Sequence, residues 1–224
     1  MNFTIRKSAC LLAALCCLAS CTVMGCSDDQ SSKNGGNAAE TDAPGVEVYA
    51  PKVPEDKIDA NVPGKDIAAE PAKEIVYEGD KGKVTVKLEK VIELDAAKKS
   101  DKRVLLAEMT ITNNGTKEID CSELTHFSAK IDGTENLNTV RDVKAAIDAR
   151  KYYTRISSEL QSFNQQIAAG ESLNGYVYMG LPASWKDLEL IYIPYKYYSN
   201  DTITFKIAED SITHYTEELD AKTN

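Results

Sequence analysis

The sequence lacks most of the groups that a catalytic or metal centre requires. It has two histidines, His126 and His214, and beyond residue 26 it has a single cysteine, Cys121. These three residues have no metal-ligand spacing between them. The sequence contains no Gly-x-Ser-x-Gly elbow, no His-Glu-x-x-His pair and no phosphate-binding glycine loop. We therefore predict a protein that is not an enzyme, with no catalytic residues, no metal site and no cofactor.

The scarcity of cysteine after residue 26 also excludes an internal disulfide framework. Cys121 lies between Asp120 and Glu123 in EIDCSEL, and nearby acids raise the pKa of a thiol. This favours a buried structural thiol over a nucleophile. We expect both histidines to be surface or structural residues.

The sequence has no excess of positive charge, because 26 Lys and Arg stand against 35 Asp and Glu, for a net charge of -9. The acidity lies in the two tails, whereas residues 75–207 hold almost equal numbers of acids and bases. Without a basic patch we expect no nucleic-acid partner.

The N-terminus has the pattern of a secretory signal. Arg6 and Lys7 precede the apolar stretch SACLLAALCCLAS, which is too short for a lasting membrane span. LASC, ending at Cys21, resembles the bacterial lipobox. VMGC, ending at Cys26, resembles it less well because Met24 is bulky, but it is followed at once by the polar SDDQSSKNGGN.

We therefore predict a signal peptide over 1–20 or 1–25, with lipid attached to Cys21 or Cys26. The alternatives are an ordinary cleaved signal and an uncleaved anchor. Two or three acyl chains on one cysteine hold a protein durably in a membrane. The expected location is the extracytoplasmic face of the cell membrane.

Three further regions differ in composition. Residues 27–74 are acidic, contain repeated proline and a Gly-Gly pair, and show no lasting helical or strand period, which predicts a disordered tether. Residues 75–208 alternate apolar and polar side chains in short runs separated by turn residues, which predicts strands. Residues 209–224 form an acidic C-terminal tail.

About seven short strands are expected over 75–208, which fits an all-β, immunoglobulin-like β-sandwich without a disulfide. A bulge is expected near Lys90, where the alternation breaks. NNGT (113–116) predicts a hairpin turn, with KEIDC as the returning strand. Val140, Val143 and Ile147 recur at helical spacing, which predicts a helix near 140–150 inserted at an open end or an edge of the sandwich.

Four segments in this order resemble a known family: MTITNNGTKEI, FSAKIDG, IAAGESLNGYVYMGLP, and LELIY with a final ITFKI. They are similar to the immunoglobulin-like extracellular domains of unknown function in Gram-positive lipoproteins, the immunoprotective extracellular, immunoglobulin-like superfamily. The resemblance covers about residues 75–208 and implies a fold and an extracytoplasmic setting. It implies no catalytic residue, and the insertion at 139–163 departs from it.

Aromatic residues gather late in the chain, since nine of the eleven tyrosines lie at or after residue 152. Trp185, Tyr195, Tyr197 and Tyr198 are the candidate binding surface, because tyrosine covers area with little loss of entropy and offers a hydroxyl. The alternative is that these rings pack against the inserted helix or the loop ends. The favoured function is a lipid-anchored protein that binds a protein or a cell-wall glycan, and the alternative is a structural or accessory component of an envelope complex without its own ligand.

Overall fold

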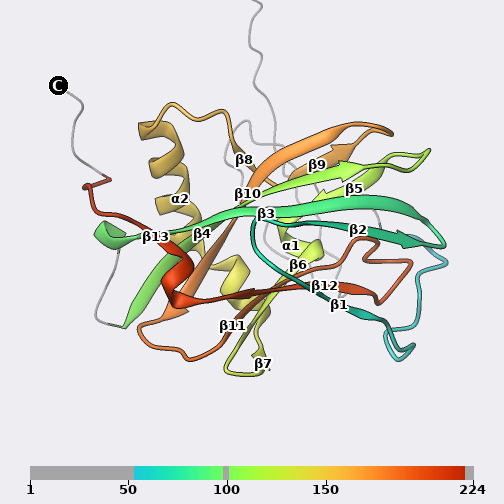
Figure 1. Cartoon of the computed structure of the whole chain (residues 1–224), viewed down its shortest axis with the longest axis horizontal. Helices are drawn as coiled ribbons and strands as arrows, with labels where there is room; N and C mark the ends of the chain where they lie inside the picture. The colour runs from blue at the N-terminus through green and yellow to red at the C-terminus, as the bar shows by residue number, and fades with distance from the viewer. Residues whose placement is uncertain (1–52, 98–100, 220–224) are drawn as a thin grey trace, which may run out of the picture. The chain divides into compact units, whose positions relative to one another are not determined.

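Two long antiparallel strands, β3 (Gly82–Leu94) and β4 (Lys102–Asn113), form the centre of the first sheet of the computed structural model, which describes residues 53–97 and 101–219. This sheet has six strands in the order β13-β3-β4-β10-β8, with β2 also paired to β3 (Figure 1). The remaining strands are β2 (Glu74–Gly79), β8 (Gln161–Ser162), β10 (Ser172–Pro182) and β13 (Ile212–Tyr215).

The second sheet has five strands in the order β1-β12-β11-β6-β7. They are β1 (Asp66–Ala69), β12 (Thr202–Ile207), β11 (Leu188–Tyr192), β6 (Phe127–Ile131) and β7 (Thr134–Glu135). β1 runs parallel to β12, and β11 pairs antiparallel with β12 and β6. A separate two-stranded sheet joins β5 (Ile119–Ser122) to β9 (Asn164–Ile167).

The core lies between the two large sheets, where strand alternation directs apolar side chains inward. Leu105, Ala107, Met109 and Ile111 of β4 face it, as the alternation of the sequence predicts. Ile203, Phe205 and Ile207 of β12 close it from the other sheet. The prediction of an all-β sandwich is confirmed.

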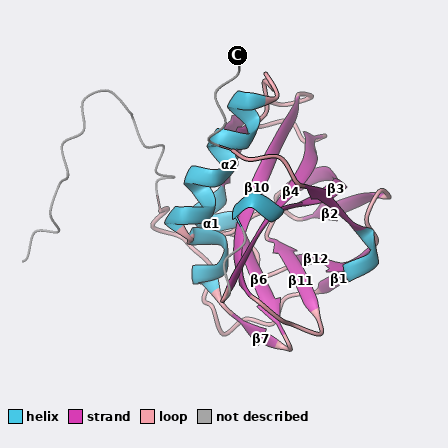
Figure 2. Cartoon of the chain, turned by 90° about the vertical axis from the view of Figure 1, so that its left-hand side faces the viewer, coloured by secondary structure: helices cyan, strands magenta, loops and turns pink. Residues whose placement is uncertain are grey.

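The helix α2 (Val143–Arg155) packs on the outer face of the six-stranded sheet and makes a third layer (Figure 2). Asp142 caps it, because its carboxylate accepts a hydrogen bond from the backbone N–H of Ala145 at 2.9 Å. The other helical segments are α1 (Glu123–His126), η1 (Asp95–Ala97), η2 (Leu137–Arg141) and η3 (Glu209–Ser211). Among the described residues, no helix is long and apolar enough to cross a membrane.

The helical insertion is confirmed, but its expected position and buried face differ from the structure. α2 covers a sheet face and not an open end or an edge. Val143 and Ile147 point to solvent, at 73% and 52% exposed, whereas the helix buries Ala145, Ala149 and two tyrosines. The small alanines allow close approach to the sheet, and the spacing of larger apolar residues did not identify that face.

The folded part extends beyond both expected limits. Within the expected tether of 27–74, β1 pairs with β12 over Asp66–Ala69, and β2 begins at Glu74. Within the expected tail of 209–224, β13 pairs in parallel with β3 over Ile212–Tyr215. Short strands at sheet edges need little apolar surface of their own, so composition alone missed them. Residues 27–52 of the tether, and Cys21 and Cys26, lie outside the described residues.

The number of strands is also larger than seven, because the described residues form thirteen. The bulge is confirmed by a register shift between Leu88 and Lys90. The prediction of a hairpin at 113–116 is wrong. The segment after the turn does not return along β4, but crosses to pair with β9 over Ile119–Ser122.

Candidate ligand-binding pocket

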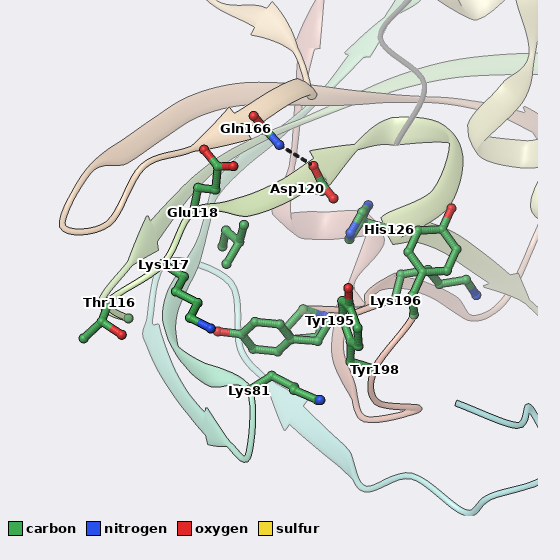
Figure 3. Close-up of a pocket in the computed structure, with 14 residues that line it drawn as sticks. Lys81, Thr116, Lys117, Glu118, Asp120, His126, Gln166, Tyr195, Lys196 and Tyr198 are labelled. Atoms are coloured by element: carbon green, nitrogen blue, oxygen red, sulfur yellow. Dashed lines mark hydrogen bonds between the residues drawn. The ribbon is translucent and has the colours of Figure 1, made fainter. Parts of the chain in front are cut away.

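A pocket of about 350 Å³ opens where five segments of the chain meet. They are the turn between β2 and β3, the loop 115–118 with the start of β5, the end of α1, Gln166 of β9, and the loop 194–198 that follows β11 (Figure 3). The segments come from distant parts of the sequence, so the sandwich itself assembles the pocket. Its volume lies near the lower end of the range for small-molecule sites.

The buried side chain of Asn113 holds one wall of the pocket in place. Its amide nitrogen donates to the carbonyls of Lys117 at 2.7 Å and Ile167 at 2.9 Å. Its oxygen accepts from the backbone N–H of Gly115 at 3.0 Å. Three hydrogen bonds from one fully buried amide explain why the NNGT turn leads away from β4 instead of reversing along it.

His126 lies in the pocket wall as a neutral imidazole. It is 2% exposed, and burial is the main cause that lowers its pKa to about 4, with a further lowering by nearby Lys196. Its Nδ1 accepts the backbone N–H of Ser122 at 3.2 Å, which assigns the proton to Nε2. The Nε2–H is therefore the group through which His126 can donate to a ligand.

Tyr195 is a second buried polar group in the wall. It is 7% exposed, and its hydroxyl has no hydrogen-bond partner. Its ring lies 5.9 Å from that of Tyr77, and its hydroxyl lies against Gly82, where an added Cβ would approach within 2.5 Å. A buried hydroxyl without an acceptor costs about 1–3 kcal/mol of stability, and this one is enclosed by the protein.

Charged side chains surround these two groups. Lys81, Lys117 and Lys196 contribute three ammonium groups, and Glu118 and Asp120 contribute two carboxylates. The Lys81 nitrogen lies 4.9 Å from the centre of the Tyr198 ring, in cation–π geometry. Gln166 donates to Asp120 at 3.2 Å, as the dashed line in Figure 3 marks.

The four aromatic residues of the candidate surface do not lie together. Tyr195, Tyr197 and Tyr198 line the pocket, and of these only Tyr198 is exposed, at 39%. Trp185 does not line it. The Trp185 ring is half-buried against the core, with Arg103 5.3 Å from its centre and its Nε1 without a hydrogen-bond partner.

Most other late tyrosines pack beneath α2. Tyr152, Tyr153, Tyr176 and Tyr178 are buried there, and Tyr153 stacks on Tyr176 with ring centres 4.1 Å apart. The packing alternative concerned the candidate surface and not these four rings; of the candidate residues, Tyr195 and Trp185 pack against the core between the sheets. The sequence did not indicate the other pocket residues, since Lys81, Lys117 and His126 come from segments that no motif connects to the late tyrosines.

Cys121 is fully buried, and burial is the main cause that raises the pKa of its thiol well above the ordinary value. Such a thiol stays protonated and is a poor nucleophile, which agrees with a structural role. It is the free cysteine of the described part of the chain.

One cluster of potential metal ligands lies outside the pocket. Glu93, Asp95 and His214 bring ligand atoms within 4.8 Å of one another. Arg103 donates to both oxygens of the buried Glu93, at 2.8 and 2.5 Å, and also to Glu209. Because the guanidinium already neutralises Glu93, we interpret the cluster as an ion-pair network that fastens β13 to the sheet.

The architecture is that of a two-sheet β-sandwich with a helix on one outer face and a small polar pocket at the loops. Residues 62–193 match a family model described as a domain of unknown function, DUF5067. The match covers more than half of the chain, so the protein belongs to the DUF5067 family. This agrees with the expected domain of unknown function, whereas the immunoglobulin-like superfamily remains an expectation. No curated protein matches the chain.

Several solved structures are similar at low sequence identity. YcdA of Bacillus subtilis, a candidate lipoprotein, is 17% identical with a TM-score of 0.41, over 62% of this chain and 41% of that one. MPT63, a secreted protein of Mycobacterium tuberculosis, is 11% identical with a TM-score of 0.43, over 63% and 98%. An uncharacterised β-sandwich protein of Clostridium difficile is 12% identical with a TM-score of 0.38, over 65% and 97%. At these scores the likenesses carry no argument about function.

Proposed function

We propose that this protein is a lipoprotein, held at the extracytoplasmic face of the cell membrane by lipid on Cys21 or Cys26, whose β-sandwich binds a cell-wall glycan. The observation that carries the binding role is the pocket, where two buried polar side chains, His126 and Tyr195, stand beside charged residues and the exposed Tyr198. Unpartnered buried hydroxyls also occur at Ser128 and Tyr192, away from the pocket, so the gathering of polar side chains at one pocket is what supports the proposal.

The lipid anchor is supported by the lipobox-like LASC and by the polar stretch after Cys26. Mass spectrometry of the mature N-terminus tests it, with Cys21→Ala and Cys26→Ala as the two variants. The lipidated cysteine is the one whose loss leaves the protein unmodified. An unmodified N-terminus downstream of residue 26 in the unaltered protein would contradict the anchor.

Binding to isolated cell-wall sacculi, followed by sedimentation, tests the glycan role. Tyr198→Ala removes the exposed side chain of the pocket, with its hydroxyl and its cation–π contact to Lys81, and should lower the bound fraction several-fold. Leu137→Ala is the matched control, because Leu137 is 46% exposed and does not line the pocket. If the unaltered protein does not sediment with sacculi but co-purifies with a fixed envelope partner, the accessory role replaces the binding role.

A further inference from the structure

We infer that the pocket recognises an acidic ligand, a saccharide that carries a carboxylate; this rests on the proposed function of the pocket as a glycan site. The inference names the chemistry of the ligand, which neither the family nor the fold supplies. It follows from the balance of charge, the supply of hydrogen-bond donors and the scarcity of free aromatic surface around the pocket.

The pocket is locally positive in an acidic protein. Three ammonium groups, those of Lys81, Lys117 and Lys196, face two carboxylates, whereas the whole chain carries a net charge of -9. One of the carboxylates, Asp120, accepts a hydrogen bond from Gln166. A concave site with low-dielectric walls strengthens the electric field of this excess positive charge, and the field attracts anions.

The uncharged groups of the pocket also favour a ligand rich in acceptors. The ring of His126 is neutral and offers the Nε2–H, because Nδ1 already accepts the backbone N–H of Ser122. The Tyr195 hydroxyl has no partner but is enclosed against Gly82, so the donors open to a ligand are the Nε2–H of His126 and the ammonium groups of the lysines. Oxygen atoms of a carboxylate satisfy such donors better than the hydroxyl groups of a neutral sugar, since hydrogen bonds to an ionised acceptor are stronger.

The pocket offers little free aromatic surface on which a sugar ring could stack. Tyr195 is buried, and the nitrogen of Lys81 already lies over the ring of Tyr198 at 4.9 Å. Arginine is absent from the pocket lining, and no helix begins there, so the groups that most favour phosphate are missing from these described residues. A carboxylate is therefore the anion that the pocket fits best.

The test compares two sugars that differ in one acidic substituent. N-acetylmuramic acid has the ring of N-acetylglucosamine with a lactyl carboxylate added. Isothermal titration calorimetry of the full-length protein in detergent should show the acid binding about tenfold more tightly than the neutral sugar, which is the gain of one charge-assisted contact. The difference should shrink as salt is raised, because exposed lysines are screened.

Two variants assign the effect to the pocket. Lys117→Ala should lower the affinity for the acid about three- to tenfold and that for the neutral sugar by a smaller factor. Lys206→Ala is the matched control, since its exposed ammonium lies on β12, outside the pocket lining, and should change neither affinity. An unchanged melting temperature in both variants shows that the fold is retained.

The outcomes separate the inference from the function on which it rests. If both sugars bind equally, or the neutral sugar binds better, the carboxylate inference is wrong and the glycan site stands. If neither sugar binds and sacculi do not bind either, both are wrong. If the acid binds better but Lys117→Ala and Lys206→Ala weaken it equally, recognition lies outside the pocket and the inference is again wrong.

Discussion

The two apolar layers of the protein are built from different side chains. Between the sheets, the buried residues are mostly aliphatic or phenylalanine, and the two sheets enclose them from both sides. Beneath α2, four tyrosines are buried, and two of their hydroxyls donate to carboxylates, Tyr153 to Glu108 and Tyr178 to Glu123, each at 3.1 Å. A layer covered by a single helix remains near water, and tyrosine suits it because the ring is buried while the hydroxyl finds an acceptor.

The largest expected change in stability comes from two neighbouring residues of β4, one in each layer. Leu105 and Leu106 are both fully buried, Leu105 between the sheets and Leu106 beneath α2. Leu105→Ala should lower the free energy of unfolding by about 4 kcal/mol, and Leu106→Ala by about 2–3 kcal/mol, because one helix can relax into a cavity more readily than two sheets. Urea denaturation of both variants measures this, and a larger loss for Leu106→Ala would contradict the comparison.

The next effect concerns pH and His126. Burial lowers its pKa to about 4, from about 6.5 in the unfolded chain. Between these values only the unfolded chain takes up the proton, so stability is full above pH 6.5 and falls as the pH drops toward 4, by up to about 3 kcal/mol. NMR titration of the imidazole should give an apparent pKa near 4. Titration of His126 near 6.5 would contradict its neutral, buried state.

Glu123, on the tyrosine side, should act in the opposite direction. Burial is the main cause that raises the pKa of this carboxyl above its ordinary value, so the folded protein holds the proton more tightly than the unfolded chain. Its contribution to stability is therefore largest at low pH and is lost as the pH rises through the folded pKa. Glu123→Gln should flatten this part of the profile above pH 4.5, as measured by urea denaturation across pH. An unchanged profile would show that Glu123 titrates normally.

Loss of a single tyrosine hydroxyl should be milder. Tyr153→Phe removes the hydrogen bond to Glu108 but keeps the stacked ring, so the expected cost is about 1 kcal/mol. Lys90, 3.2 Å from the other oxygen of Glu108, still neutralises that carboxylate. Thermal unfolding measures the change in stability. Tyr152→Phe is the control, since Tyr152 belongs to the same cluster and the structure gives its hydroxyl no hydrogen bond. Equal losses of stability in both variants would show that the hydrogen bond from Tyr153 to Glu108 does not stabilise the fold.

The smallest effect on stability has the opposite sign and belongs to the pocket. Tyr195→Phe removes a buried hydroxyl that has no partner, so the protein should become slightly more stable, by up to about 1 kcal/mol. Thermal unfolding measures this change. A loss of stability would mean that the hydroxyl has a partner within the fold.

Much of the fold could be read from local pattern. The alternation of apolar and polar residues predicted β4 and β12 and their inward faces. The break in this alternation near Lys90 predicted the bulge, and apolar residues at helical spacing predicted α2. The buried thiol of Cys121 followed from its isolation and its acidic neighbours. These features depend on residues close in sequence, because a strand or a helix sets the direction of each side chain with a short, fixed period.

The candidate site was only partly predictable. Tyr195, Tyr197 and Tyr198 are neighbours in sequence and lie at one pocket, but Trp185 lies elsewhere, since β11 carries the chain across the sandwich between them. Nothing in the sequence identified His126, Lys81 and Lys117 as binding residues. They lie in separate segments, and only the packing of the two sheets brings these segments together. The short strands β1 and β13 were missed for the same reason, as edge pairing depends on a partner far away in sequence.

The sequence by itself determined the β class, the core-facing positions, the helix in the insertion and the isolation of Cys121, since all depend on local period and composition. Only the tertiary structure decided which strands pair, that α2 buries a second face of β4, and that Asn113 turns the chain toward β9 instead of back along β4. It also decided the pocket, because contacts between loops distant in sequence have no local signature. Packing two sheets fixes those loops together, and the chemistry of the pocket follows from that packing.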